Sequence, residues 1–105
     1  MGEDAWVSVV PRSTLVEGKG LHVVVGAHEI ALFLVGGALY ALGAVCPHSG
    51  GPIHQGFIAD GWVKCPLHLW EFELRSGRHR HLQRICLPRY PVREHQGQVQ
   101  VQVPP

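Results

Sequence analysis

Short apolar or alternating runs, separated by glycine-containing turns, cover most of the 105-residue chain. The clearest alternation is QVQVQV at 98–103, whose valines fall on one face of an extended strand. The run EIALFLV at 29–35 is largely apolar and predicts a central strand. Similar, shorter patterns predict further strands at 5–10, 21–25, 38–44, 61–65, 70–74 and 90–94.

The turns between these runs carry residues that tolerate positive φ. Gly36-Gly37 predicts a tight hairpin between the strands at 29–35 and 38–44. The pairs at 60–61, 76–77 and 96–97 end in glycine and predict equally sharp reversals.

No pattern predicts a helix of ten or more residues, and segment 11–18 has room for a single helical turn. Short strands at this spacing favour an antiparallel β-sandwich or small barrel over β-α-β units. There is no repeat, low-complexity tract or linker, so residues 1–105 are expected to form a single domain.

Composition supports a packed core, because 46% of the residues are hydrophobic and 16% are charged. The net charge of +1 argues against strong binding to nucleic acid or to an anionic membrane. The basic stretch RSGRHRH at 75–81 is expected to be a solvated turn. No apolar run is long enough to span a membrane and no signal peptide is visible, so we expect a cytoplasmic protein.

The cysteines, at positions 46, 65 and 86, are too few for a disulfide framework. In a reducing compartment such residues are more often metal ligands or buried thiols. Cys86 lies between apolar neighbours in RICLPRY and is expected to be buried and inert.

Cys46 and Cys65 each begin a short cysteine–histidine motif, CPH at 46–48 and CPLH at 65–68, with sixteen residues between the motifs. Thiolate and imidazole suit zinc, copper or iron–sulfur centres. A zinc site would normally have two to four residues between paired ligands, and C-x-H is cramped for one ion. A two-iron cluster removes the difficulty, because each loop can send its cysteine to one iron and its histidine to the other.

The paired motif resembles that of Rieske [2Fe–2S] proteins, with CPHSGGPI and CPLHLWEFELRSG matching the two cluster loops. The resemblance covers nearly the whole chain. It implies a Rieske-like antiparallel sandwich or small barrel, with a cluster-binding subdomain inserted at about 45–72. It also implies one [2Fe–2S] cluster per chain, with Cys46 and Cys65 on the inner iron and His48 and His68 on the outer iron.

Departures from the high-potential Rieske pattern predict a low reduction potential. The positions of the second cysteine pair, which forms a disulfide in respiratory Rieske proteins, are Gly51 and Leu67 here. The positions of the serine and tyrosine that donate to sulfur there are Trp70 and Phe72. Fewer donors stabilise the reduced cluster less, which places the potential toward the low end of the roughly −150 to +300 mV Rieske range.

The resemblance implies an electron-transfer protein with no catalysis of its own. A soluble Rieske ferredoxin would pass single electrons from an NAD(P)H-dependent flavoprotein reductase to a terminal oxygenase, binding each partner transiently as a monomer. The run at 30–42 also resembles the small subunit of NAD(P)H-dependent nitrite reductase, many of which lack the cluster ligands. A structural zinc module is the third alternative.

Apolar residues of the two loops, namely Ile53, Leu67, Leu69 and Trp70, are expected to shield the cluster or to offer a dry docking patch. The run Gly50-Gly51-Pro52 is expected to bring backbone close to the cluster. His54 is expected to be either part of the exposed rim or a plain polar residue of the first loop. The other histidines, His22, His28, His79, His81 and His95, are expected to be surface or structural residues.

Overall fold

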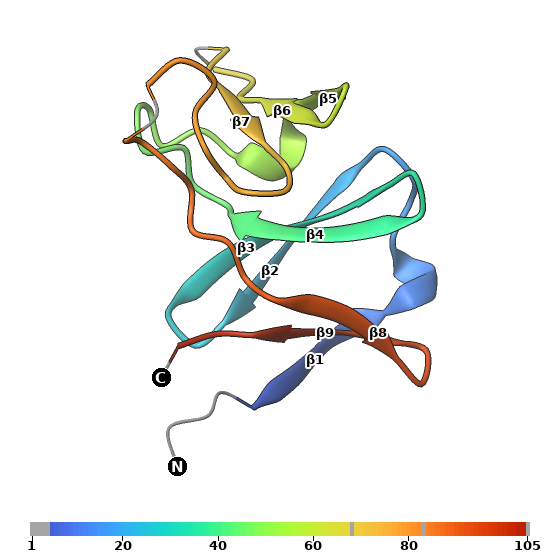
Figure 1. Cartoon of the computed structure of the whole chain (residues 1–105). Helices are drawn as coiled ribbons and strands as arrows, with labels where there is room; N and C mark the ends of the chain where they lie inside the picture. Colours follow the sequence, from blue (N-terminus) through green and yellow to red (C-terminus); the bar gives the residue numbers. More distant parts are fainter. Residues whose placement is uncertain (1–4, 68, 83, 105) are drawn as a thin grey trace.

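The computed structural model, which describes residues 5–67, 69–82 and 84–104, is built almost wholly from antiparallel strands (Figure 1). This confirms the predicted all-β fold class. The elements in chain order are β1 (Trp6–Pro11), η1 (Arg12–Thr14), β2 (Gly20–Val25), β3 (His28–Val35), β4 (Ala38–Gly43), η2 (Ile53–Gln55), β5 (Phe57–Ala59), β6 (Trp62–Lys64), β7 (Glu71–Glu73), β8 (Val92–His95) and β9 (Gln98–Gln102).

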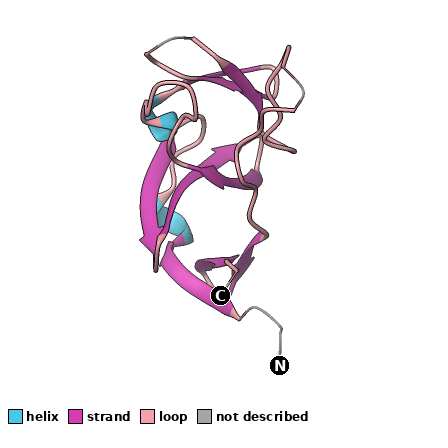
Figure 2. Ribbon diagram, turned by 90° about the vertical axis from the view of Figure 1, so that its left-hand side faces the viewer, coloured by secondary structure: helices cyan, strands magenta, loops and turns pink. Residues whose placement is uncertain are grey.

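The strands form three small sheets, with orders β1-β9-β8, β2-β3-β4 and β5-β6-β7. Figures 1 and 2 show the third sheet at one end of the molecule, away from β1 and β9. The first two sheets pack through a shared apolar core, and the third follows the loop that leaves β4. The third sheet therefore lies within the segment predicted to carry the two motifs.

Strand β3 is buried on both of its faces, which explains its continuous apolar sequence. Ile30, Leu32 and Leu34 face the core shared with β9, where they meet buried valines. Ala31 and Phe33 face the opposite core, which also contains both motif cysteines. Burial of a side chain the size of Phe33 contributes on the order of 1.5–3 kcal/mol. A single strand thus contributes to both the core shared with β9 and the core that contains the two motif cysteines.

Three of the four predicted tight turns are confirmed by positive φ values at both central residues, whereas in the pair at 76–77 only Gly77 has positive φ, at 79°. Gly36 and Gly37 have φ of 61° and 79°, and the pairs at 60–61 and 96–97 behave alike, with φ of 53° and 85° and of 52° and 80°. Two consecutive positive φ values are typical of hairpin turns that match the twist of the strands. The predicted single helical turn within 11–18 is present as η1. The sequence patterns missed β5 and η2, which are three residues each.

The expectation of a buried Cys86 is wrong, because its thiol is exposed. The residue pairs with Arg78 in an isolated bridge, and extended backbone alternates its side chains. Leu87 takes the inward position at 1% exposure, which leaves Cys86 facing out. Among the described residues, no helix is long and apolar enough to cross a bilayer.

Gly77 and Gly97 form a matched pair for testing how tightly the loop after β7 is held. Their φ values are 79° and 80°. A methyl group on Gly77 would collide with the carbonyl oxygen of Leu87, whereas one on Gly97 meets nothing within 4 Å. We expect Gly97→Ala to cost about 1–2 kcal/mol for the left-handed backbone, and Gly77→Ala a further 1–3 kcal/mol or so for overpacking. Urea unfolding of both variants checks this, and equal losses would contradict the close packing.

Candidate metal centre

The first motif lies in a tight loop that follows β4. The backbone N–H of Cys46 donates to the carbonyl of Gly51 at 2.9 Å, and the N–H of Gly50 donates back to the carbonyl of Cys46 at 2.8 Å. An isolated bridge between Val45 and Pro52 closes the base of the loop. These bonds satisfy polar backbone groups that would otherwise be costly beside a buried cysteine.

The second motif repeats this arrangement between β6 and β7. The N–H of Cys65 donates to the carbonyl of Trp70 at 2.7 Å, and the N–H of Leu69 donates to the carbonyl of Cys65 at 3.0 Å. The residue four positions after each cysteine has positive φ, 73° at Gly50 and 61° at Leu69. Two loops distant in sequence thus present their cysteine and the residues after it in the same backbone geometry.

The predicted ligands divide into buried and exposed groups. Cys46 and Cys65 have 0% exposure and lie in the same core cluster. His48 is exposed at the first loop. His68 lies outside the described residues. The described ligands therefore place the sulfurs inside the protein and an imidazole at its surface.

Gly51 of the first loop packs closely against the sulfur of Cys65. An added Cβ on Gly51 would lie 2.7 Å from the Cys65 sulfur, so only glycine fits there. The Ser49 hydroxyl lies 3.9 Å from the same sulfur, a contact that the sequence did not predict. Two buried soft thiols, a glycine cradle and a surface imidazole fit an iron–sulfur cluster. Among the described residues, no three His, Cys, Asp or Glu side chains converge on a single metal ion.

An aromatic stack supports His48. Its imidazole lies parallel to the Trp70 indole, with 4.2 Å between ring centroids and 10° between ring planes. His79 meets Trp70 edge-on, with a centroid distance of 4.5 Å and an interplanar angle of 86°. The contacts therefore run from a buried ring through an indole to the surface imidazole.

His79 belongs to this site, although in the sequence it stands out only as a histidine in a basic stretch. It is buried at 6% exposure. The backbone N–H groups of His81 and Leu82 donate to its Nδ1 at 3.0 and 2.9 Å. A ring nitrogen that accepts two hydrogen bonds is unprotonated, so the neutral ring carries its proton on Nε2. Nε2 is buried and has no hydrogen-bond partner among the described residues.

The apolar residues of the loops have different exposures. Leu67 and Leu69 are each 57% exposed and flank the undescribed position 68. Ile53 has 0% exposure, so it can shield the interior but cannot dock a partner. Phe57 on β5 adds another exposed ring, at 64%. The second loop and β5 thus supply exposed apolar surface, and Val45 before the first motif adds to it at 47% exposure.

His54 is half-buried beside a 250 Å³ hollow next to the first loop. Burial, with a smaller contribution from His22, lowers the pKa of His54 below its usual 6.5. The Nε2–H of His22 donates to the Glu29 carboxylate at 3.0 Å, and the His22 ring centroid lies 5.3 Å from that of His54. His54 is therefore a half-buried polar residue beside the first loop, and it does not form part of an exposed rim.

A family model for the Rieske-like [2Fe–2S] domain matches residues 5–102. The chain therefore belongs to the Rieske-like [2Fe–2S] domain family. Membership implies a Rieske [2Fe–2S] cluster, in agreement with the donor set of the two loops.

Curated relatives and solved structures extend the match along nearly the whole chain. The chain is 31% identical over 94 residues to the ferredoxin component of the naphthalene 1,2-dioxygenase system from Pseudomonas putida, covering 84% of this chain and 86% of the relative. It is 33% identical over 101 residues to the 3-phenylpropionate/cinnamic acid dioxygenase ferredoxin subunit of Escherichia coli K12, covering 90% of each. The crystal structure assigned to an NADH-dependent nitrite reductase small subunit from Mycobacterium tuberculosis superposes with a TM-score of 0.90 at 28% identity, covering 96% of both chains.

Leu67 and Leu69 allow a controlled test of backbone strain at the second loop. The two leucines share the same exposure, but only Leu69 has positive φ. Leu67→Gly should destabilise the protein by about 0.4–1 kcal/mol, through the entropy of the unfolded chain. Leu69→Gly carries the same entropic loss but regains about 1–2 kcal/mol of left-handed strain. Thermal or urea unfolding should therefore show the Leu69 variant as the more stable one, and the reverse order would exclude strain there.

His79 should make the folded state sensitive to acid. Burial lowers its pKa below 6.5, a nearby His81 lowers it further, and Glu71 opposes both. Because the unfolded chain then binds the proton more readily, stability is complete above about pH 6.5 and falls as the pH drops toward the folded-state pKa. Urea midpoints of His79→Gln should fall less between pH 7.5 and 5 than those of the wild type. The exposed His95→Gln serves as the control. If the urea midpoints of all three proteins fell equally between pH 7.5 and 5, His79 would not be the source of the acid sensitivity.

Proposed function

We propose that the protein is a one-electron carrier of the Rieske ferredoxin type. Cys46 and Cys65 would bind the inner iron of its [2Fe–2S] cluster, and His48 and His68 the outer iron. The carrier would take electrons from an NAD(P)H-dependent flavoprotein reductase and deliver them to a terminal oxygenase. It would perform no chemistry on an organic substrate.

The observation that carries this proposal is the pair of loops with matching backbone hydrogen bonds, each beginning at a buried cysteine. When bound, a cluster of this kind supplies a single reversible electron at a potential set by its ligands and their hydrogen bonds. The protein keeps the thiols away from water, and His48 remains at the surface. This arrangement supports electron exchange through the histidine edge.

Hydrogen bonding around the thiols supports a potential at the lower end of the Rieske range. The Ser49 hydroxyl, at 3.9 Å from the Cys65 sulfur, is a long contact. Phe72 is fully buried and has no hydroxyl to donate. Gly51 and Leu67 occupy the positions of the second cysteine pair, so a disulfide cannot join the loops there. Without a hydroxyl at position 72, the negative charge of the reduced state is less compensated there.

Exposed leucines beside the centre support transient docking. Leu67 and Leu69 are exposed next to the proposed ligand at position 68. A small apolar contact excludes water from the donor–acceptor gap without a large buried area, as expected for a weak redox encounter. A carrier that binds two partners in turn needs such weak binding, because it must dissociate from one partner before it can bind the other.

The curated relatives favour an oxygenase system as the recipient of the electrons. The two described above are named as ferredoxin components or subunits of dioxygenase systems, at 31% and 33% identity. By analogy we assign this chain the same task, with the reductase as the donor. Its organic substrate would be chosen by the oxygenase.

The second candidate is the small subunit of an NAD(P)H-dependent nitrite reductase. It is favoured by the TM-score of 0.90 to a structure assigned to that class. The presence of all four candidate ligands in the sequence favours the carrier instead. Co-purification with a large subunit that holds flavin and sirohaem would support the reductase.

A redox titration followed by absorbance and electron paramagnetic resonance tests the proposed carrier. We expect a red-brown protein that takes up one electron toward the low end of the roughly −150 to +300 mV range. A colourless protein without a redox step would contradict the proposal, and stoichiometric zinc would indicate a structural module.

Ligand variants test the assignment of individual residues. His48→Cys and His68→Cys each replace a neutral ligand with an anionic one, which should lower the potential or release the cluster. His95→Cys, on exposed β8, is the matched control and should leave both unchanged. If colour and potential survived His48→Cys unaltered, His48 would not be a ligand.

A further inference from the structure

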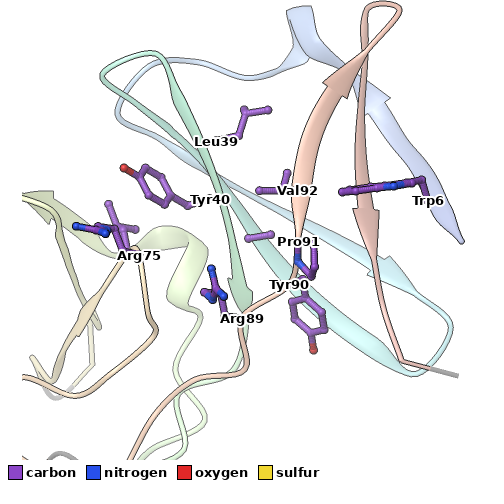
Figure 3. Close-up of a pocket in the computed structure, with 10 residues that line it drawn as sticks. Trp6, Leu39, Tyr40, Arg75, Arg89, Tyr90, Pro91 and Val92 are labelled. Atoms are coloured by element: carbon purple, nitrogen blue, oxygen red, sulfur yellow. The ribbon is translucent and has the colours of Figure 1, made fainter. Parts of the chain in front are cut away.

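A groove lies where the third sheet meets the rest of the molecule, on a face that the proposed electron transfer does not use. Figure 3 shows its walls, with Tyr40 of β4 and Val92 of β8 on either side of Arg89. Arg75 borders it from the turn after β7, and Trp6 of β1 closes the far side. The cavity measures 330 Å³, and a second hollow of 520 Å³ continues past Arg75 and Arg89.

The groove has more positive than negative charge. Neither Arg75 nor Arg89 forms an ion pair with a carboxylate among the described residues. Glu73 lines the second hollow with them, but its carboxylate accepts a hydrogen bond from the Ser76 hydroxyl at 2.6 Å. Two guanidinium groups therefore face one carboxylate, and both arginines are exposed.

The surrounding sequence strengthens this asymmetry. Segment 75–89 contains no aspartate or glutamate. Arg80, within it, is already engaged by Glu71 at 3.4 Å and lies over the Trp62 ring. On the far wall, Arg93 lies 4.2 Å from the centroid of the Trp6 ring and adds a further positive charge. The basic arginines of the segment are Arg75, Arg78, Arg80, Arg84 and Arg89.

We propose that this groove binds an acidic segment of a protein partner, with carboxylates at Arg75 and Arg89 and a neighbouring apolar side chain against Tyr40 and Val92. Arginine is suited to carboxylates because the N–H groups of one guanidinium form two parallel, charge-assisted hydrogen bonds with them. Aromatic and aliphatic walls beside such a pair suit an apolar residue next to the acid.

A protein segment fits better than a small organic acid. Small-molecule sites enclose most of their ligand, whereas both arginines here are exposed and the two hollows join end to end. An extended chain could follow that path, with its acidic residue at the shared arginines. None of the lining residues belongs to the loops at 46–51 and 65–70. A partner could therefore hold the groove while the histidine edge remains accessible.

This inference deepens the proposed carrier function, because it specifies the surface chemistry of an electron-transfer partner. A segment anchored in the groove would restrict the orientations in which that partner approaches the loops. It would also make association dependent on salt, because exposed charges are screened within about 10 Å at 0.1 M ionic strength.

Nuclear magnetic resonance of the oxidised, cluster-containing protein tests the groove without any electron transfer. The probe is the peptide acetyl-ELEFE-amide, and acetyl-QLQFQ-amide is its neutral match. We expect the acidic peptide to shift the Nε–Hε signals of Arg75 and Arg89 and to bind more weakly as salt is added. The double variant Arg75→Gln/Arg89→Gln should raise the Kd about tenfold or more, the loss expected for one charge-assisted hydrogen bond.

The control variant Arg12→Gln/Lys19→Gln removes the same charge near η1, from residues that line neither hollow. Its Kd should match that of the wild type. Equal weakening of peptide binding in both double variants would show that the effect comes from net charge, and would overturn the proposed site. Absence of binding by the acidic peptide, or equal binding of its neutral match, would also overturn it. Benzoate binding as tightly as the peptide would indicate a small-molecule site instead.

The redox titration separates this inference from the proposed function. If colour and potential were normal but no peptide bound, the docking site would be rejected and the proposed carrier function would stand. Peptide binding to a protein that shows no redox step would reject the carrier and leave the groove as a docking site.

Discussion

Burial of β3 on both faces is the constraint on which the rest of the structure depends. Its even-numbered residues pack toward the valines of β9, and its odd-numbered residues pack toward the core that holds Cys46 and Cys65. A strand with a polar face could not serve two cores, because the unpaired polar groups would be desolvated at a cost of about 1–3 kcal/mol each. The position of the two loops relative to the core shared with β9 therefore depends on this single strand.

The two loops make a similar turn with different residues. Each must turn sharply after a buried cysteine, and each uses a left-handed residue four positions later. The first loop places Gly50 there, whereas the second places Leu69, an exposed leucine in a conformation that favours glycine. Strain of this kind persists where surrounding structure enforces it, and it is common at functional sites. Here it coincides with apolar surface next to the proposed histidine edge.

Much of the fold could be predicted because its signals are local. Alternation in β9, the apolar run in β3 and the paired positive-φ residues at 60–61 and 96–97 all depend on neighbours in the chain. Strand β5 was missed because its residues, Phe-Ile-Ala, are all apolar and do not alternate, although the first and the last of them are exposed. Cys86 was placed wrongly because apolar neighbours do not reveal which way one side chain of an extended segment faces.

The sequence by itself determined the chemistry of the site: two cysteine–histidine motifs whose ligand types and spacing suit a two-iron cluster. It could do so because ligand identity and short spacings are properties of adjacent residues. Only the tertiary structure placed His79 behind Trp70, Trp70 against His48, and Arg75 beside Arg89. Those neighbours come from separate strands and turns, and their proximity depends on how the sheets pack around β3.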